Sequence, residues 1–287
     1  MDKIVLENLT VRFGNFVAVK NVNIRVKAGE ILGLLGPNGA GKTTTIKAIL
    51  GFVPYEGRIE VKAEKLGWMP QNAPLYLNLT VEENLRFFAE AYGVKKIKEK
   101  VEELLKLTEL QRFRNRLVRN LSGGMKQRCA FACAIVHEPD LLILDEPTAG
   151  VDPKLRKSFW EYFESLNREG KTILITTHYM DEAEKCQRIV LMRDGEILAE
   201  GSPEEIKRRA LGGEIVKIKV KDINLALEIL KKAELNAEIK GDEIWVFVDD
   251  AEAKVPDIIK TLESFNVFRV ELESETLENA FLKLIGG

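Results

Sequence analysis

The sequence predicts an α/β fold, with one domain over residues 1–210 and a smaller α+β domain over residues 214–287. A glycine-rich loop, Gly36–Thr44, lies between a strand-like apolar run and a helix-like run. Two more apolar runs, 141–144 and 172–176, alternate with helical stretches. The second domain has the order strand, helix, strand, strand, helix, strand, which is the ferredoxin-like βαββαβ order.

The chain opens with two predicted strands, Ile4–Phe13 and Val17–Val26. Apolar and polar residues alternate in the second strand, which is the period of a strand with one buried face. Short strands are also expected at 58–61 and 65–69. We expect an antiparallel β subdomain in addition to the main sheet.

The glycine-rich loop fits the pattern G-x-x-x-x-G-K-[ST] without a mismatch. Its residues are Gly36, Pro37, Asn38, Gly39, Ala40, Gly41, Lys42, Thr43 and Thr44. Glycines let successive backbone N–H groups point at phosphate oxygens, and the following helix N-terminus adds donors. Lys42 is expected to contact the β- and γ-phosphates, and the Thr43 hydroxyl to ligate Mg²⁺. The alternative is a glycine-rich turn that only starts a helix, which the flanking strand and helix disfavour. The loop therefore predicts a P-loop NTPase fold.

A helical insert is predicted at about 80–137. Thr80 and Glu83 have the spacing of a capping box ahead of an amphipathic helix. Lys96–Leu107 is a second amphipathic helix, and Ser122 can cap a third.

Two carboxylates follow the apolar run at 141–144. Asp145, at the strand end, suits Mg²⁺, held through water. Glu146, one residue further on, suits a base that polarises the attacking water. The motif alone leaves open that Glu146 is a plain loop charge.

Further elements complete the first domain. Asp152-Pro153 is an N-cap followed by proline at the first helical position. His178 lies just beyond the strand at 172–176. Residues 189–199 have a hairpin pattern, and Ser202 caps a short final helix.

Leu211-Gly212-Gly213 is predicted to be a linker. The second domain is predicted from strands at 215–220, 237–240, 243–248 and 267–272 and helices at 225–232 and 253–265. Gly241-Asp242 supplies a tight turn between the middle strands.

The chain has 287 residues, of which 45% are hydrophobic and 31% charged, with a formal net charge of −2. This balance gives no support for a nucleic-acid-binding surface. Cys129, Cys133 and Cys186 are too few for a disulfide framework and indicate a reducing compartment, and the first two are expected to pack in the core. No run approaches the length of a membrane span, and we expect no signal peptide.

The residues Leu121-Ser122-Gly123-Gly124-Met125-Lys126-Gln127-Arg128 lie upstream of the acidic strand end. Here the chain resembles the ATP-binding cassette (ABC) family, the ATPase subunits of ABC transporters, which have an LSGGQ motif at the start of a helix. The resemblance implies that Ser122, Gly123 and Gly124 reach the γ-phosphate held by a partner chain, as a second helix N-terminus that binds an anion. Met125 stands where the family usually has Gln. An ordinary N-cap role for Ser122 is compatible with this one.

Four more residues match motifs of the family in order. Gln71 matches the Q-loop glutamine, which contacts Mg²⁺ and reports to the membrane subunit. Asp152 matches the D-loop aspartate, although it is also a good N-cap. His178 matches the switch histidine at the γ-phosphate. Phe13 stands where the family has an adenine-stacking aromatic, usually Tyr, and a core position is the alternative.

The resemblance covers residues 1 to about 210, and Leu79–Leu85 and Thr276–Leu282 are similar to ABC-2-type exporter ATPases in particular. It implies an ATPase that uses ATP and Mg²⁺, with Glu146, His178 and Lys42 as catalytic residues. It also implies a head-to-tail homodimer, or a heterodimer with a related ATPase. That dimer would drive a separate integral membrane permease from the cytoplasmic face of the cell membrane.

The rival prediction is a soluble cassette ATPase that acts on nucleic acid or ribosomes. DNA-repair relatives insert a long coiled coil, for which the insert at 80–137 is too short. Translation-factor relatives usually carry two cassettes per chain, and one is seen here. Nucleic acid is therefore not expected as a partner.

Overall fold

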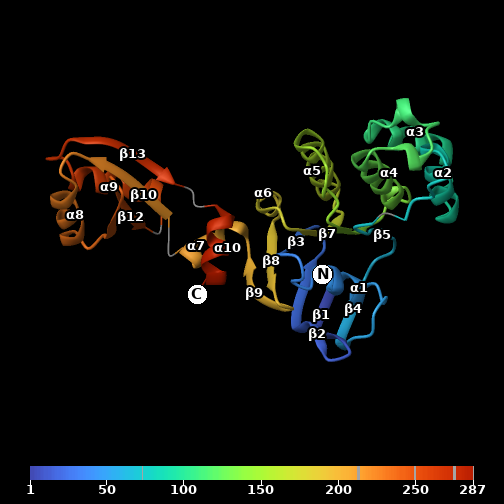
Figure 1. Ribbon diagram of the computed structural model, residues 1–287, viewed down its shortest axis with the longest axis horizontal. Helices are drawn as coiled ribbons and strands as arrows, with labels where there is room; N and C mark the ends of the chain where they lie inside the picture. Colours follow the sequence, from blue (N-terminus) through green and yellow to red (C-terminus); the bar gives the residue numbers. More distant parts are fainter. Residues whose placement is uncertain (73, 212–213, 249, 274–275, 287) are drawn as a thin grey trace. The chain divides into compact units, whose positions relative to one another are not determined.

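The computed structural model describes residues 1–72, 74–211, 214–248, 250–273 and 276–286 (Figure 1). The chain forms two compact units, Met1–Glu200 and Gly201–Gly287. This division lies upstream of the predicted boundary after residue 210. The predicted linker glycines, Gly212 and Gly213, lie outside the described residues.

A six-stranded sheet with the order β5-β6-β7-β3-β8-β9 forms the centre of the first unit. Its strands are β5 (Leu66–Met69), β6 (Leu141–Asp145), β7 (Thr172–Thr177), β3 (Ile31–Leu35), β8 (Arg188–Arg193) and β9 (Glu196–Gly201). The first five strands in this order, β5-β6-β7-β3-β8, pair in parallel. Strands β3, β6 and β7 are buried along their whole length. Their carboxyl ends therefore meet at one edge, where ligands bind in sheets of this kind.

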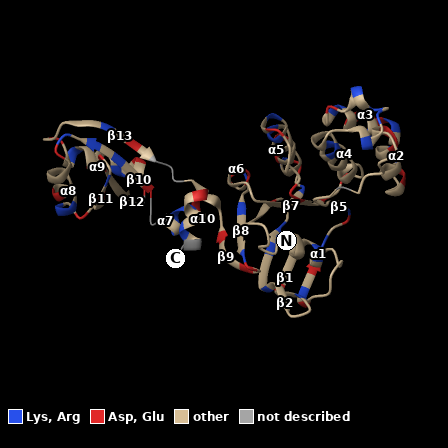
Figure 2. Cartoon of the chain, viewed as in Figure 1, with Lys and Arg blue, Asp and Glu red and all other residues tan. Residues whose placement is uncertain are grey.

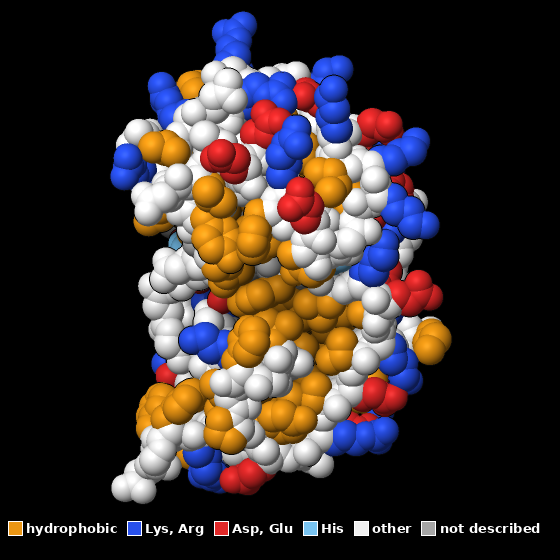
Figure 3. Space-filling model, turned by 90° about the vertical axis from the view of Figure 1, so that its right-hand side faces the viewer, with side chains coloured by type: hydrophobic (Ala, Val, Ile, Leu, Met, Phe, Trp, Pro, Cys, Tyr) orange, Lys and Arg blue, Asp and Glu red, His pale blue; other side chains and the backbone are white. Residues whose placement is uncertain are grey.

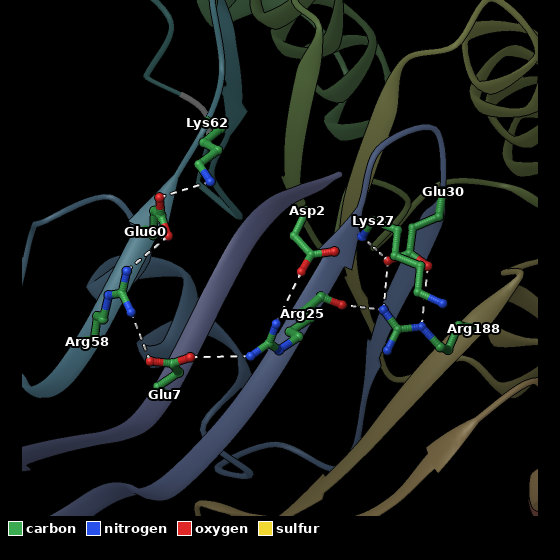
Figure 4. A network of polar contacts seen from close by, with 9 residues as sticks. All are labelled: Asp2, Glu7, Arg25, Lys27, Glu30, Arg58, Glu60, Lys62 and Arg188. Atoms are coloured by element: carbon green, nitrogen blue, oxygen red, sulfur yellow. Dashed lines mark hydrogen bonds and ion pairs between the residues drawn. The ribbon is translucent and has the colours of Figure 1, made fainter.

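A three-stranded antiparallel sheet packs next to the parallel one, as predicted. Its strands are β1 (Asp2–Phe13), β2 (Phe16–Lys27) and β4 (Glu56–Val61). Polar contacts across this sheet continue to the parallel one (Figure 4). Glu7 pairs with Arg25 and Arg58, and Arg188 on β8 pairs with Glu30 at 2.7 Å and donates to the Arg25 carbonyl. Arg188 and Glu30 are mostly buried, so this pair is screened less than the exposed ones.

The predicted helical insert is present as α2 (Val81–Ala91), α3 (Ile97–Leu107) and α4 (Gly123–Ile135). Thr80 and Glu83 form the predicted capping box. Acidic and basic residues are interspersed on α2 and α3 (Figure 2), and Arg86 donates to Glu82 one turn away. Cys129 and Cys133 are buried, which confirms their predicted place in the core. No helix among the described residues is long and apolar enough to cross a bilayer.

The first unit also contains the α-helices α1 (Lys42–Ile49), α5 (Pro153–Arg168) and α6 (Met180–Ala183), and two short 3-10 helices, Gln111–Phe113 and Val118–Asn120. Each α-helix follows the carboxyl end of a parallel strand, either directly or after a loop. The N-termini of α1 and α5 are thereby brought to the edge of the sheet where β3 and β6 end.

The second unit contains the predicted ferredoxin-like fold. Its elements are β10 (Glu214–Val220), α8 (Ile223–Lys232), β11 (Asn236–Lys240), β12 (Glu243–Val248), α9 (Ala251–Thr261) and β13 (Val267–Glu273). The sheet is antiparallel with the order β11-β12-β10-β13, and its core packs against α8 and α9. Helices α7 (Pro203–Leu211) and α10 (Leu277–Gly286) also belong to this unit and pack against each other.

Candidate active site

The glycine-rich loop runs from the end of β3 to the start of α1, as predicted. Its glycines are required by the local geometry. A Cβ atom on Gly36 would lie 2.2 Å from the carbonyl oxygen of Met192. Gly41 has φ +101°, and a Cβ atom there would lie 2.8 Å from the carbonyl oxygen of Ala18. The loop is thus wedged between β2 and the end of β8.

Lys42 begins α1, and its side chain is only 5% exposed. Its Nζ donates to the carbonyls of Gly36 at 2.8 Å and Pro37 at 3.1 Å, and lies 3.6 Å from Oε1 of Glu146. Burial lowers the pKa of Lys42, while the carboxylates of Glu146 and Asp145 oppose that shift. The backbone carbonyls of the loop thus hold the ammonium group over the loop.

Asp145 ends β6 opposite Thr176 of the neighbouring strand β7. Its Oδ1 accepts from the hydroxyls of Thr176 at 2.5 Å and Thr43 at 3.1 Å. Burial raises the pKa of Asp145, and the two hydroxyl donors lower it. The Thr43 hydroxyl and the Asp145 carboxylate are hard oxygen ligands side by side, so this pair fits Mg²⁺, which needs only one or two protein ligands beside phosphates and water.

Glu146 lies in a left-handed conformation with φ +48°, which a non-glycine residue seldom adopts. Its N–H is held by the carbonyl and the hydroxyl of Thr176, at 3.2 and 2.9 Å. Its carboxylate accepts from Gln71 Nε2 at 3.1 Å, and Nδ1 of His178 lies 3.4 Å away. The structure thus brings Lys42, Gln71 and His178 together around one carboxylate.

A cleft of about 430 Å³ lies in front of this cluster. It is lined by the predicted residues Phe13, Asn38, Gly39, Ala40, Gly41, Lys42, Thr43, Thr44, Gln71, Glu146 and His178. Phe16 and Ala18 also line it, and sequence reasoning missed both. Phe16 is the cross-strand partner of Phe13, and both rings are half exposed or more, at 65% and 50%. The sequence offered one signal for Phe16. The tight turn at Gly14, directly after Phe13, makes Phe16 the cross-strand neighbour of that ring.

Ser122, Gly123, Gly124 and Asp152 do not line this cleft among the described residues. Ser122 caps α4, where its Oγ accepts from the N–H of Met125, and Asp152 caps α5 through the N–H of Leu155. Ser122 and Asp152 are exposed. A Cβ atom on Gly123 would meet nothing within 4 Å, so packing within the chain does not require this glycine.

The family model described as ABC transporter matches residues 19–149. The probable multidrug ABC transporter ATP-binding protein YbhF of Escherichia coli is 45% identical over 222 residues, which are 72% of this chain and 38% of that protein. Nod factor export ATP-binding protein I of Burkholderia lata is 36% identical over 97% of this chain and 95% of its own length. This chain belongs to the ABC transporter family.

A solved ABC cassette dimer, in a post-hydrolysis state bound to ADP and Pi, has the same fold as the first unit. It matches with a TM-score of 0.64 and 30% identity, over 69% of this chain and 98% of its own. The predicted P-loop cassette fold is confirmed. As an ABC cassette, the chain binds ATP. It spans little more than a third of the length of the E. coli relative.

Proposed function

We propose that this ABC cassette hydrolyses Mg²⁺-ATP as a head-to-tail dimer and thereby drives a separate membrane permease, as an exporter subunit on the cytoplasmic face of the membrane. The observation that carries the proposal is the cluster at the end of β6, where the Glu146 carboxylate meets Lys42, Gln71 and His178. Nod factor export and multidrug transport stand in the names of the relatives, which supports the exporter assignment.

In the proposed mechanism the loop amides of Gly36–Thr44 bind the phosphates, and Phe13 stacks on the adenine. Mg²⁺, when bound by Thr43, Asp145 and Gln71, supplies charge neutralisation on the phosphate oxygens. Glu146 accepts the proton of the attacking water. Lys42 and His178 stabilise the charge that develops on the γ-phosphoryl oxygens.

A second chain completes the site through Ser122, Gly123, Gly124 and Asp152. Three observations support this: these residues lie outside their own chain's cleft, Ser122 and Asp152 are exposed, and Gly123 has no internal packing role. The free N–H groups at the start of α4 would meet the γ-phosphate of the partner. The similarity to a dimeric cassette bound to ADP and Pi fits the same arrangement.

The permease is proposed to dock on an apolar surface beside Gln71. Hydrophobic side chains gather across the middle of one face of the molecule (Figure 3). Beside Gln71, a small hollow between β5 and α2 is lined by Trp68, Pro70, Pro74, Leu75, Phe88 and Tyr92. The exposed rings of Tyr76 and Phe87 contact each other with centroids 4.5 Å apart. A partner on this surface would press on the segment that joins Gln71 to α2.

The dimer mechanism is tested by the concentration dependence of hydrolysis. If each site needs two chains, ATPase activity per mole of the purified protein rises with protein concentration and then saturates. The apparent order in protein approaches two at low concentration. Constant activity per mole down to the lowest concentrations, with the chain monomeric by light scattering, would contradict the dimer mechanism.

A further inference from the structure

Glu182, on α6, is a buried carboxylate that contacts the two segments of the chain that carry Glu146 and His178. Its side chain is only 1% exposed. One oxygen, Oε1, accepts from the hydroxyl of Thr148, and the other, Oε2, accepts from the hydroxyl of Thr177 at 2.7 Å. Thr148 lies two residues after Glu146, and Thr177 lies directly before His178. A single carboxylate therefore joins the loop that carries Glu146 to the strand end that carries His178.

A second set of contacts leads from Glu182 to the same histidine. Nε of Arg156, on α5, lies 3.5 Å from Oε1 of Glu182. The guanidinium group of Arg156 stands over the ring of Tyr179, 4.0 Å from its centroid. The Tyr179 ring in turn lies against the His178 ring, with centroids 4.1 Å apart. The imidazole is thus supported on one side by an aromatic ring whose own position depends on the Glu182–Arg156 pair.

The loop from Glu146 to Asp152 is short and internally bonded. The N–H of Ala149 donates to the Glu146 carbonyl, and the N–H of Val151 donates to the Thr148 carbonyl. Because Glu146 is in a rarely populated conformation, surrounding contacts must hold it there. The bond from Thr148 to Glu182 anchors the middle of this loop.

We propose that Glu182 is a positioning residue that sets the Glu146 carboxylate and the His178 imidazole relative to each other. This inference rests on the proposed roles of Glu146 and His178. Glu182 itself contacts neither the nucleotide cleft nor the reacting atoms among the described residues. A misplacement of catalytic groups by about 1 Å can cost about 10²-fold in rate, so loss of this anchor lowers kcat while ATP affinity is kept.

Removing Glu182 would leave the Arg156 guanidinium without its buried partner, so the test uses the two threonines instead. Thr148→Val and Thr177→Val keep the shape of the side chain and remove the hydroxyl. Thr172→Val is the matched control, because Thr172 is buried on the same strand as Thr177, at its opposite end, and its hydroxyl accepts from the N–H of Gly29, away from the site. Thermal melting shows whether the three losses of stability are similar.

For both site variants the expected result is a fall in kcat of about tenfold or more with KM for ATP changed by no more than about twofold. The control keeps its kcat. Both threonines bond the same carboxylate, and the Thr177 hydroxyl also accepts from the N–H of Tyr179 at 3.0 Å. The loss of kcat in the double variant is therefore expected to be well below the product of the two single losses. Wild-type kcat in Thr148→Val and Thr177→Val, or losses that simply multiply in the double variant, would overturn the inference.

Glu146→Gln, measured in parallel, separates the proposed role of Glu182 from the proposed role of Glu146 as the base. If it hydrolyses ATP at the wild-type rate, the proposed base is wrong. If it is inactive while the threonine variants turn over normally, the proposed function stands and the role of Glu182 falls.

Discussion

Nζ of Lys42 lies 3.6 Å from Oε1 of Glu146, and both side chains are almost fully buried. The two residues come from different strand ends, β3 with its loop and β6. Their charges balance each other inside the site, so a change in one alters the environment of the other.

Lys42→Ala should abolish hydrolysis and strongly weaken ATP binding, because it removes the positive charge that would contact the β- and γ-phosphates. A fall in turnover of about 10² or more is expected. Lys47→Ala, on the exposed side of the same helix, is the matched control. Circular dichroism should show both variants folded. Near wild-type turnover in Lys42→Ala would contradict the assignment of the loop.

Glu146→Gln nearly preserves the shape of the side chain and removes the proposed base. ATP should still bind, since Lys42 and the loop amides are untouched, and hydrolysis should fall by about 10² or more. The γ-phosphate then persists, so Mg²⁺-ATP should shift the variant from monomer to a lasting dimer while ADP does not. Adding Ser122→Arg should prevent the dimer by steric bulk. Size exclusion with light scattering decides this, and a monomer in saturating ATP would count against the two-chain site.

Asp145→Asn should stabilise the nucleotide-free protein near neutral pH. Burial raises the pKa of Asp145 above its ordinary value of 3.8, so the folded chain binds this proton more tightly than the unfolded chain does. Ionised Asp145 therefore costs stability as the pH rises above that value. The gain in Tm for the variant should shrink as the pH is lowered toward about 4, and Mg²⁺-ATP should stabilise the variant less than the wild type. A variant less stable than wild type at neutral pH would refute this.

Phe13→Ala should weaken ATP binding by about 1–3 kcal/mol, the range for a base stacked on an aromatic ring. GTP affinity should fall similarly, since stacking depends on the π-face. Phe16→Ala is the informative comparison, because Phe16 lies opposite Phe13 and also lines the cleft. Calorimetric titration of both variants shows which ring carries the base. Unchanged affinity in a folded Phe13→Ala chain would show that the ring does not stack on the base.

Deleting residues 214–287 should leave nucleotide binding intact, because every residue that lines the cleft belongs to the first unit. That deletion keeps α7 and removes α10, its packing partner. Deleting residues 201–287 removes both helices, and the resulting chain should have a higher Tm than the chain that lacks only residues 214–287. A folded truncated chain that cannot bind ATP would show that the division into units is wrong.

The sequence by itself determined the class of fold and most of the candidate site. The loop with Lys42, the strand end with Asp145 and Glu146, and the position of His178 all depend on local patterns. Such patterns work because a glycine in a forced turn, or a carboxylate at the end of an apolar strand, carries its structural reason within a few residues of itself.

Tertiary structure alone decided which distant residues hold those groups. Thr176 bonds Glu146 from 30 residues away, and Glu182 bonds Thr148 from 34 residues away, because neighbouring strands bring them together. In the same way α7 belongs with the second unit because its partner α10 lies at the far end of the chain. No local sequence pattern around a threonine or a glutamate predicts such a partner, because the contact forms only when the strands have assembled in their order in the sheet.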